Sequence, residues 1–385
     1  MSQSSDVIVV DIGSRSICAN VAERLSDDNF ALKAFCECEY DGYCEGVWLN
    51  PDDPLSSIYK VLNNVERSTG KMKTVYVGIP ADFCVVRTIY DKISFPKPKK
   101  ITNLDLQELF DLNDPFAESK YTRINSEAIY YVDDKGERLR DPVGCVTSFL
   151  RANLTYVGAD SKLLSLISQG LLRHGVKNVR FIQSEYAAAL ALFTREERER
   201  GILFADIGFS VTSILHLTGD ALLEMRTFAL GGSMIPAGLS NRYDIPYRVS
   251  AAILPKINLG YKEEGEYSLK YDASSYSFPV SEVNDMTKEC VRVLANYLQK
   301  AVQSFKFDSA PNQKIYLTGG GLSEIRLADE YLAKCLDRSV EKVMPTTPNF
   351  ARPYYSTGFG LIRYALALEK KEKFGFLKRL FNIGG

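Results

Sequence analysis

Two segments of this chain repeat one pattern: an apolar run that ends in Asp-Ile-Gly, a few small residues, and a second apolar run. The first copy covers residues 7–21 and the second covers residues 202–217, with Asp11 and Asp206 at the ends of their first runs. Each copy predicts a buried strand, a tight turn and a returning strand. Because the pattern occurs twice, we expect two structurally similar halves.

The two Asp-Ile-Gly turns also indicate a kind of ligand. A carboxylate beside the exposed backbone amides of a glycine turn can hold a metal-bound phosphate. If the halves face each other, their turns can bind one nucleotide from both sides. A single Asp-Ile-Gly is most simply the end of a strand, whereas two copies with matching flanks favour the binding site.

The composition sets broad limits on the class of protein. With 385 residues the chain exceeds one ordinary domain, and its 45% hydrophobic and 25% charged residues are typical of a soluble globular protein. A net charge of −1 argues against binding to nucleic acid over the whole chain. The first six residues carry no signal segment, and no apolar run is long enough to cross a membrane. The eight cysteines are scattered, as in reduced cytoplasmic proteins, and two histidines do not predict a histidine metal site.

Alternating strand and helix patterns predict an α/β fold. Residues 82–159 interrupt the alternation with several strand patterns around one helix, which we interpret as a small inserted module. The expected parts are a first half (6–81 and 160–200, with a helix at 355–370 returning to it), the inserted module (82–159), a second half (201–354, with an outer part at 241–308) and a C-terminal tail (371–385).

A third signal is a glycine-rich turn late in the second half. Residues 315–318 predict a buried strand, and Gly319, Gly320 and Gly321 follow it directly. Because glycine has no Cβ, such a turn lets the backbone approach a flat ligand closely. Alone this is a weak signal, but here it follows two Asp-Ile-Gly hairpins in order.

The order of these features resembles the actin-like ATPase superfamily, which includes actin, sugar kinases and Hsp70 chaperones. The shared order is a first hairpin, an Ala-rich helix with a Glu, a second hairpin, and a strand that ends in Thr-Gly-Gly. Within this superfamily the chain resembles the FtsA family of bacterial cell-division proteins over almost its whole length. Residues 353–361, residues 142–144 before a strand, and the basic, aromatic tail carry that resemblance. It implies two actin-like halves around a nucleotide cleft, with the inserted subdomain of FtsA.

The resemblance further implies ATP in the cleft. Asp11 and Asp206 would hold Mg²⁺ through water molecules, and Glu185, at the start of the Ala-rich helix, would orient the attacking water. The other implied contacts are the turn backbones at Gly13, Ser14, Arg15, Ser16, Gly208, Ser210 and Thr212 for the phosphates, Gly319, Gly320 and Gly321 along the adenosine, and Lys256 at the ribose.

Several positions depart from the family pattern. Ser16 stands where the first turn commonly has Lys, with Arg15 beside it. In the second turn Phe209 puts a large side chain where backbone should meet phosphate, and Ser213 replaces a carboxylate. Lys256 lacks the Glu that usually precedes it by three residues. We therefore expect ATP binding with slow or absent hydrolysis; the alternative is a degenerate cleft that keeps only the fold.

The resemblance implies a cytoplasmic protein, peripheral on the inner face of the cell membrane, that tethers FtsZ-type filaments there and polymerises itself. Its expected partners are the C-terminal peptide of an FtsZ-type protein, other copies of itself and an anionic membrane surface. The peptide would bind the outer part of the second half, where Arg292, Lys300 and Lys306 are available to acidic residues. The alternative is that these cations form only a solvated helix face.

Two other functions stay open at this point. One is a pilus-assembly adaptor like PilM, which shares the fold but is not expected to carry such a tail. The other is an actin-fold enzyme, either a kinase or an Hsp70-like ATPase. A sugar kinase needs a substrate-binding Asp and a sugar pocket, and an Hsp70-like protein needs a peptide-binding domain, for which the residues after Gly360 are too few.

The tail predicts an amphipathic helix over residues 371–381. With about 100° between successive residues, its large apolar side chains fall within an arc of roughly 160° and its cations lie opposite them. The membrane-binding residues we expect are Phe374, Phe376, Leu377, Lys378, Arg379, Leu380 and Phe381. Such a helix lies in the membrane interface, with cations toward anionic headgroups, and it is too short to span. The alternative is a helix packed back on the body.

Overall fold

The structure is a computed structural model. It describes residues 6–25, 29–41, 43–44, 47–48, 50, 52–69, 73–260, 264–307 and 313–381. The side chains at 43–44, 68–69 and 371–381 lie outside this description, as do those of the residues between and beyond these ranges.

The first half is built on a five-stranded sheet in the order β11-β6-β1-β2-β3. The Asp-Ile-Gly hairpin forms β1 and β2, which pair antiparallel, while β6 and β11 join them as parallel strands on the other side of β1. The elements are β1 (Asp6–Ile12), β2 (Ser16–Arg24), β3 (Phe30–Glu39), β4 (Tyr43–Cys44), β5 (Val47–Trp48), α1 (Asp52–Thr69), β6 (Thr74–Ile79), α3 (Ser161–Arg173), β11 (Asn178–Gln183) and α4 (Ser184–Leu192).

The second half repeats this topology. Its sheet runs β14-β13-β12-β17-β18, with β12 and β13 antiparallel and β17 and β18 parallel to β12. The expectation of two similar halves is therefore confirmed. The elements are α5 (Arg195–Glu199), β12 (Ile202–Ile207), β13 (Thr212–Thr218), β14 (Ala221–Phe228), β17 (Ile315–Thr318), α9 (Ala328–Leu336) and β18 (Val340–Lys342).

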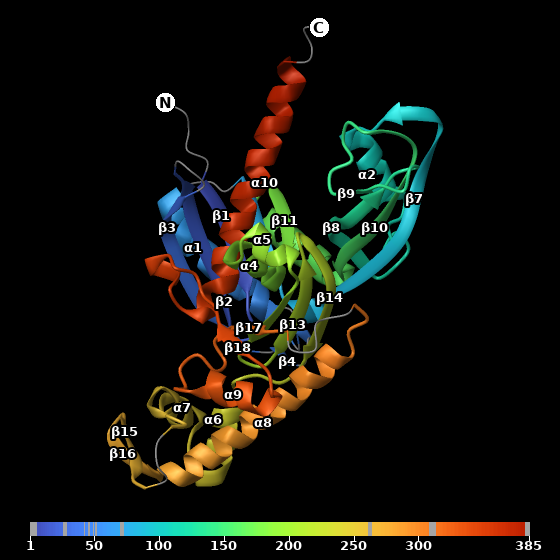
Figure 1. The fold of residues 1–385 in the computed structure, drawn as a ribbon. Helices are drawn as coiled ribbons and strands as arrows, with labels where there is room; N and C mark the ends of the chain where they lie inside the picture. The colour runs from blue at the N-terminus through green and yellow to red at the C-terminus, as the bar shows by residue number, and fades with distance from the viewer. Residues whose placement is uncertain are drawn as a thin grey trace.

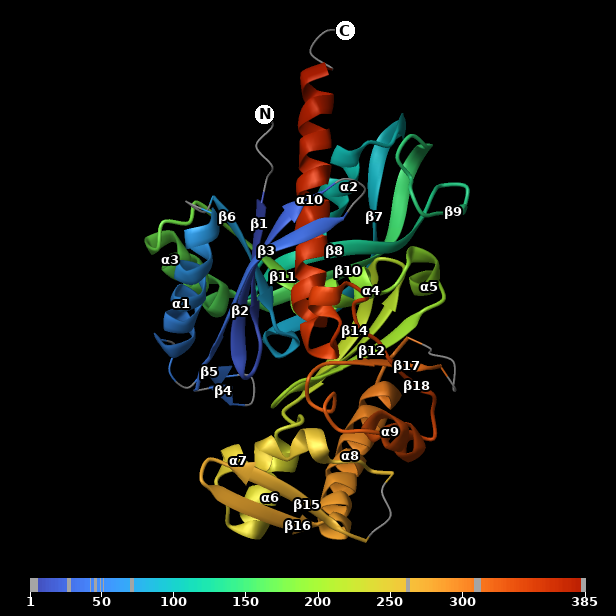
Figure 2. The same cartoon turned by 90° about the vertical axis from the view of Figure 1, so that its left-hand side faces the viewer.

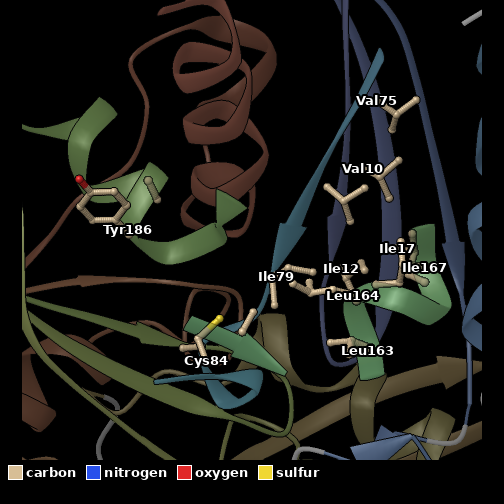
Figure 3. Close-up of a cluster of buried hydrophobic side chains, with 14 of the residues drawn as sticks. Val10, Ile12, Ile17, Val75, Ile79, Cys84, Leu163, Leu164, Ile167 and Tyr186 are labelled. Carbon is tan, nitrogen blue, oxygen red and sulfur yellow. The ribbon is translucent and has the colours of Figure 1, made fainter. Parts of the chain in front are cut away.

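One buried cluster joins the two halves. In the first half it contains Ile12 and Ile17 of the first hairpin with Ile167 of α3, which Figure 3 shows together. The same cluster continues into Phe204 of β12 and Leu215 of β13 in the second half. Apolar burial is the main favourable term in folding, so the shared core holds the two Asp-Ile-Gly turns in fixed relative positions.

The inserted module is a four-stranded sheet, β7-β10-β8-β9, with its own core around Leu109 of α2. β7 continues through residues 95–100 to Lys100, although Pro96 and Pro98 lie within it. β7 is an edge strand, and its pairing with β10 skips from Lys99 to Ser94, so Pro96 and Pro98 need no ladder N–H. The elements are η1 (Ala81–Phe83), β7 (Cys84–Lys100), α2 (Asn103–Leu112), β8 (Tyr121–Val132), β9 (Arg138–Leu139) and β10 (Val146–Asp160).

The outer part of the second half lies at the far end of the molecule from this module (Figures 1 and 2). Residues 248–259 predict a helix interrupted by Pro255, and the structure has a short helix that ends at Ala252, followed by a 3-10 turn that contains Pro255. The elements are α6 (Met234–Tyr243), α7 (Tyr247–Ala252), η2 (Leu254–Lys256), β15 (Glu266–Tyr271), β16 (Ser274–Pro279) and α8 (Val280–Gln303).

The chain then returns to the first half through η3 (Pro348–Phe350), η4 (Pro353–Tyr355) and α10 (Ser356–Phe381). Leu361 and Ala365 of α10 pack with strand β1 and helix α4 in a buried cluster. α10 continues without interruption from the body into the tail through residues 369–373, and its C-terminal part extends beyond the body (Figures 1 and 2). The predicted membrane-binding side chains of the tail lie outside the described residues. No described helix is long and apolar enough to span a membrane.

Candidate functional site

A cavity of about 930 Å³ opens between the two halves. Both Asp-Ile-Gly turns, the glycine-rich turn after β17 and the start of α4 contribute to its walls. The predicted site residues that line it are Asp11, Gly13, Ser14, Arg15, Ser16, Glu185, Asp206, Gly208, Gly319, Gly320 and Gly321. The topology of the two sheets therefore brings most of the predicted residues to one cleft.

The two turns have the same internal hydrogen bond. The amide of Gly13 donates to the carbonyl of Ser16 (2.9 Å), and that of Gly208 donates to the carbonyl of Val211 (2.9 Å). The turns also meet across the cleft, because the Ser210 amide donates to the Ser14 hydroxyl (3.2 Å). The structure thus holds the turn tips in hydrogen-bond contact.

The aspartates of the two turns lie buried at the base of the cleft. Asp11 accepts hydrogen bonds from the Thr357 hydroxyl (2.5 Å) and the Ser184 hydroxyl (3.1 Å). Burial raises the pKa of Asp11, and those two hydrogen bonds oppose the rise. Burial, followed by the nearby charge of Asp11, raises the pKa of Asp206 to about 7. Among the residues that the structure describes, neither carboxylate forms an ion pair.

The start of α10 belongs to this site, which the sequence did not show. Thr357 binds Asp11 of the first half, while the Ser356 hydroxyl lies 2.7 Å from the hydroxyl of Thr318 at the end of β17. The first turn of α10 therefore contacts β1 of the first half and β17 of the second half. The family-like segment at residues 353–361 was the only signal, and it carried no assigned role.

Glu185 is buried and held by neighbours. Its carboxylate accepts from the side chain of Gln183 and from the amide of Ala81 (3.3 Å). Burial and then the charge of Asp206 raise its pKa well above the usual range. The Glu185 carboxylate is therefore buried and already engaged by hydrogen bonds from its neighbours.

A fourth carboxyl, Asp82 of η1, also lines the cleft. Both of its oxygens are buried without a hydrogen-bond partner, and burial raises its pKa to about 6. The sequence does not reveal this residue, because nothing in Pro80-Ala81-Asp82, which follows β6, marks the Asp as inward-facing. Its orphaned oxygens are what one expects where a ligand or ion completes a site.

This set of acids fits a hydrated divalent cation. Asp11, Asp82 and Asp206 all line the cleft, and burial raises the pKa of each. A bound cation inverts that situation by favouring the charged forms. No group of three possible metal ligands occurs among the described residues, so the arrangement fits contacts through water better than a closed metal cage.

The position where the family commonly has Lys is occupied by an acidic network. The Ser16 hydroxyl donates to Glu37 (2.6 Å) and lies 2.9 Å from the Tyr354 hydroxyl, which itself donates to Glu37. Arg15 is engaged by Glu39 (2.7 Å). The chain thus supplies little free positive charge to phosphates at this turn.

Phe209 lies in the cleft wall, as its position in the second turn predicts. Its ring lies below the Arg15 guanidinium, 5.3 Å away, and makes an edge contact with Tyr247 at 6.4 Å. It therefore bridges the two halves and occupies space beside the second turn.

The glycine-rich turn packs directly against the second Asp-Ile-Gly. The amide of Gly321 donates to the carbonyl of Ile207 (2.7 Å), and Gly319 has a φ of +94°. A Cβ at Gly319 would press into Asp206 and the Ile207 backbone. Only glycine fits this conformation and spacing.

Three predicted contacts are not brought into the cavity wall. Lys256 is exposed and does not line the cleft, although its neighbours Leu254 and Pro255 do. Thr212 is buried and donates to the Leu230 carbonyl (2.7 Å). The Ser210 side chain is buried without a partner, and only its amide reaches the other turn.

No protein-family model matches the chain. Among curated proteins it is similar to the cell division protein FtsA of Pseudomonas aeruginosa, with 22% identity covering 94% of this chain and 90% of that one. FtsA of Neisseria meningitidis is 23% identical, covering 95% and 92%. FtsA of Bacillus subtilis is 19% identical, covering 95% and 84%.

Solved structures show the same architecture. The PilM–PilN type IV pilus biogenesis complex contains a chain that superimposes with a TM-score of 0.64 at 16% identity, covering 94% of this chain and 99% of that one. MreB5 of Spiroplasma citri, solved with ADP bound, has a TM-score of 0.56 at 12% identity, covering 96% and 99%. At these identities the structures show the fold alone. The chain is thus a distant relative of FtsA along almost its whole length, and its fold is that of the actin-like ATPases.

Proposed function

We propose that this chain is an actin-like cell-division protein that binds Mg-ATP in its cleft and links FtsZ-type filaments to the inner face of the cell membrane. The observation that carries the proposal is the similarity to FtsA from three bacteria over about 95% of the chain. Self-association is part of the proposal, because a row of copies multiplies a weak membrane contact.

The cleft supports nucleotide binding. Asp11 and Asp206 would hold Mg²⁺ through water, and the open glycine turn at Gly319 and Gly320 would lie along the adenosine. When bound, the ion supplies the positive charge that the first turn lacks at Ser16. MreB5 of Spiroplasma citri, which shares the fold, has been solved with ADP and with AMPPNP.

The same cleft supports slow or absent hydrolysis. Glu185 would have to accept a proton from, or orient, the attacking water. Its carboxylate is instead held by hydrogen bonds from the Gln183 side chain and the Ala81 amide, while burial and the charge of Asp206 raise its pKa. Phe209 also fills space where a smaller residue would let the second turn reach a phosphate.

The outer part of the second half is the proposed site for the FtsZ-type peptide. On α8, Arg292 donates to the Tyr331 hydroxyl (3.0 Å) and pairs with Glu289, while Lys300 lies 5.7 Å from the ring of Tyr297. Tyr297 is 44% exposed. An exposed aromatic ring beside a lysine is a suitable surface for a short peptide that carries both acidic and apolar side chains.

The membrane contact is proposed for the tail. α10 remains helical to Phe381 and extends beyond the body (Figure 2), which leaves its last turns available to a surface. Co-sedimentation with anionic vesicles tests this: the double variant Phe374→Glu with Phe381→Glu should stay in the supernatant at lipid concentrations that sediment the parent. Equal sedimentation of variant and parent would remove the tail as the anchor.

A pilus-assembly adaptor is the second candidate, because a chain of the PilM–PilN complex has the same fold. The two functions differ in their partner, so binding to an FtsZ-type filament separates them.

A further inference from the structure

The inserted module ends in a small projecting surface, formed by residues 95–104 and 141–146, which we call the module tip. It contains the last residues of β7, the start of α2 and the turn that enters β10. Figures 1 and 2, a quarter turn apart, both show the far end of β7 and the C-terminal end of α10 on the same side of the body, away from β15 and β16. A surface that meets the end of α10 would therefore face the module tip as well.

Three apolar side chains of the module tip are exposed to solvent: Leu104 by 71%, Val146 by 58% and Val143 by 41%. They belong to one locality. Val146 is the register partner of Lys100, and the amide of Ile101 donates to the Cys145 carbonyl (2.8 Å). Exposed apolar side chains that gather on a projecting turn mark an interaction surface more strongly than single ones do.

The charge of the module tip is positive. Lys97, Lys99 and Lys100 are all exposed. Lys99 pairs with Asp105 at the edge of the module tip (2.7 Å), so among the described residues Lys97 and Lys100 supply the unpaired positive charge, against the carboxylate of Asp141. Asp141 is occupied locally, because it accepts from the amide of Val143 (3.0 Å). Cations around exposed apolar residues are the combination that anionic lipid surfaces attract.

The backbone of the module tip argues against a protein strand as its occupant. β7 is the edge of the module sheet, and an added strand would need its outward N–H groups. Pro96 and Pro98 have none, so this edge cannot continue the ladder.

We propose that the module tip is a second contact with an anionic membrane surface. This inference rests on the proposed membrane attachment of α10 and adds a second attachment point to it. One contact leaves the body free to rotate about α10, whereas two separated contacts fix which face of the body points away from the membrane. A weak second contact also raises the apparent affinity of the first, because it then binds intramolecularly.

Vesicles of phosphatidylcholine, with and without phosphatidylglycerol, test the charge contribution. The variant Lys97→Glu with Lys100→Glu should lower the apparent affinity for phosphatidylglycerol vesicles at least threefold, and added salt should shrink the difference. The control Lys270→Glu with Lys288→Glu reverses the same charge on β15 and α8 at the other end of the molecule, and it should match the parent. All four lysines are outside the core, so melting temperatures should agree.

A second readout reports contact directly. Trp48 is the chain's one tryptophan and is buried, so Trp48→Phe gives a silent background. In that background, the indole introduced by Leu104→Trp should shift its emission to shorter wavelength on anionic vesicles and be quenched by brominated lipid. An indole introduced by Tyr297→Trp on α8 is the matched exposed control and should do neither.

The outcomes separate the two proposals. If the module-tip variants sediment like the parent and the indole at position 104 does not respond, the module-tip contact is wrong while the tail anchor stands. If the tail variant Phe374→Glu with Phe381→Glu binds like the parent but the module-tip variants do not, the tail anchor is wrong and the module-tip contact stands. If the parent does not bind anionic vesicles, both are overturned.

Discussion

The backbone amide of Ser210 donates to the hydroxyl of Ser14 across the cleft, with 3.2 Å between nitrogen and oxygen. This bond joins the tips of two turns that come from separate halves of the chain. Arg15 and Phe209, which are adjacent in the sequence to Ser14 and Ser210, add a cation–π contact at 5.3 Å. Phosphate groups entering between the turns would have to replace these contacts, so nucleotide binding and the spacing of the halves are coupled.

Phe209→Gly should strengthen Mg-ATP binding. Removing the ring takes away the contact with Arg15 and lets the second turn approach a phosphate. We expect an increase in affinity of roughly tenfold, about 1.4 kcal/mol, measured by isothermal titration calorimetry. Phe209→Leu is the control, since it keeps most of the bulk and should bind like the parent. A glycine variant that binds no more tightly would show that the ring does not obstruct the site.

Asp82→Asn should stabilise the protein without ligand at neutral pH. Burial raises the pKa of Asp82 to about 6, above its ordinary value near 3.8, so the folded state disfavours the charged form. The cost is therefore absent below about pH 4, grows as the pH rises toward 6, and is fully present above it. At about 1.4 kcal/mol per pKa unit it amounts to roughly 3 kcal/mol as an upper value.

Urea unfolding at pH 4 and pH 8, without divalent cations, measures this difference for Asp82. The variant should match the parent at pH 4 and exceed it at pH 8. The exposed Asp91, changed to Asn, serves as a control with no pH-dependent gain. An Asp82→Asn gain that is equal at both pH values, or a loss at pH 8, would contradict the account of a buried carboxyl without a partner.

Gly360→Val should destabilise the crossing of α10 and α4. A Cβ at Gly360 would meet the backbone of Ala187 and Ala188, which cannot move aside as a side chain can. Overpacking of this kind costs about 1–3 kcal/mol, and we expect the upper part of that range. Ala367→Val, on the exposed side of the same helix, should change the free energy of unfolding by less than about 0.5 kcal/mol. Similar values for both would mean that the helices are not in close contact.

The doubled Asp-Ile-Gly hairpin was enough to predict the fold class, because strand, turn and return strand are local patterns. The glycine turn was predictable for the same reason, and the φ of +94° at Gly319 shows why glycine stands there. The continuation of β7 through Pro96 was not predictable, since proline normally ends a strand. Proline is tolerated here because β7 is the edge strand of its sheet.

The site was harder to predict than the fold. Thr357 reaches Asp11 from the start of α10, and Asp82 lines the same cleft from η1, so the site joins segments far apart in the sequence. Lys256 was assigned by its distance from the family's usual Glu-x-x-Lys, but the 3-10 turn at Pro255 leaves it exposed outside the cavity wall. Residue type and local spacing do not encode such tertiary placement.

We propose that this chain couples FtsZ-type filaments to membranes. A three-component flotation assay tests this coupling directly. Filaments of the FtsZ-type protein from the same organism are mixed with phosphatidylglycerol-containing vesicles, which are then floated on a density step. The filaments should float with the vesicles only when this chain is present. Phe374→Glu with Phe381→Glu should abolish flotation, and Arg292→Glu with Lys300→Glu should leave this chain on the vesicles without the filaments. Filaments that stay at the bottom with the parent chain bound to the vesicles would contradict the account.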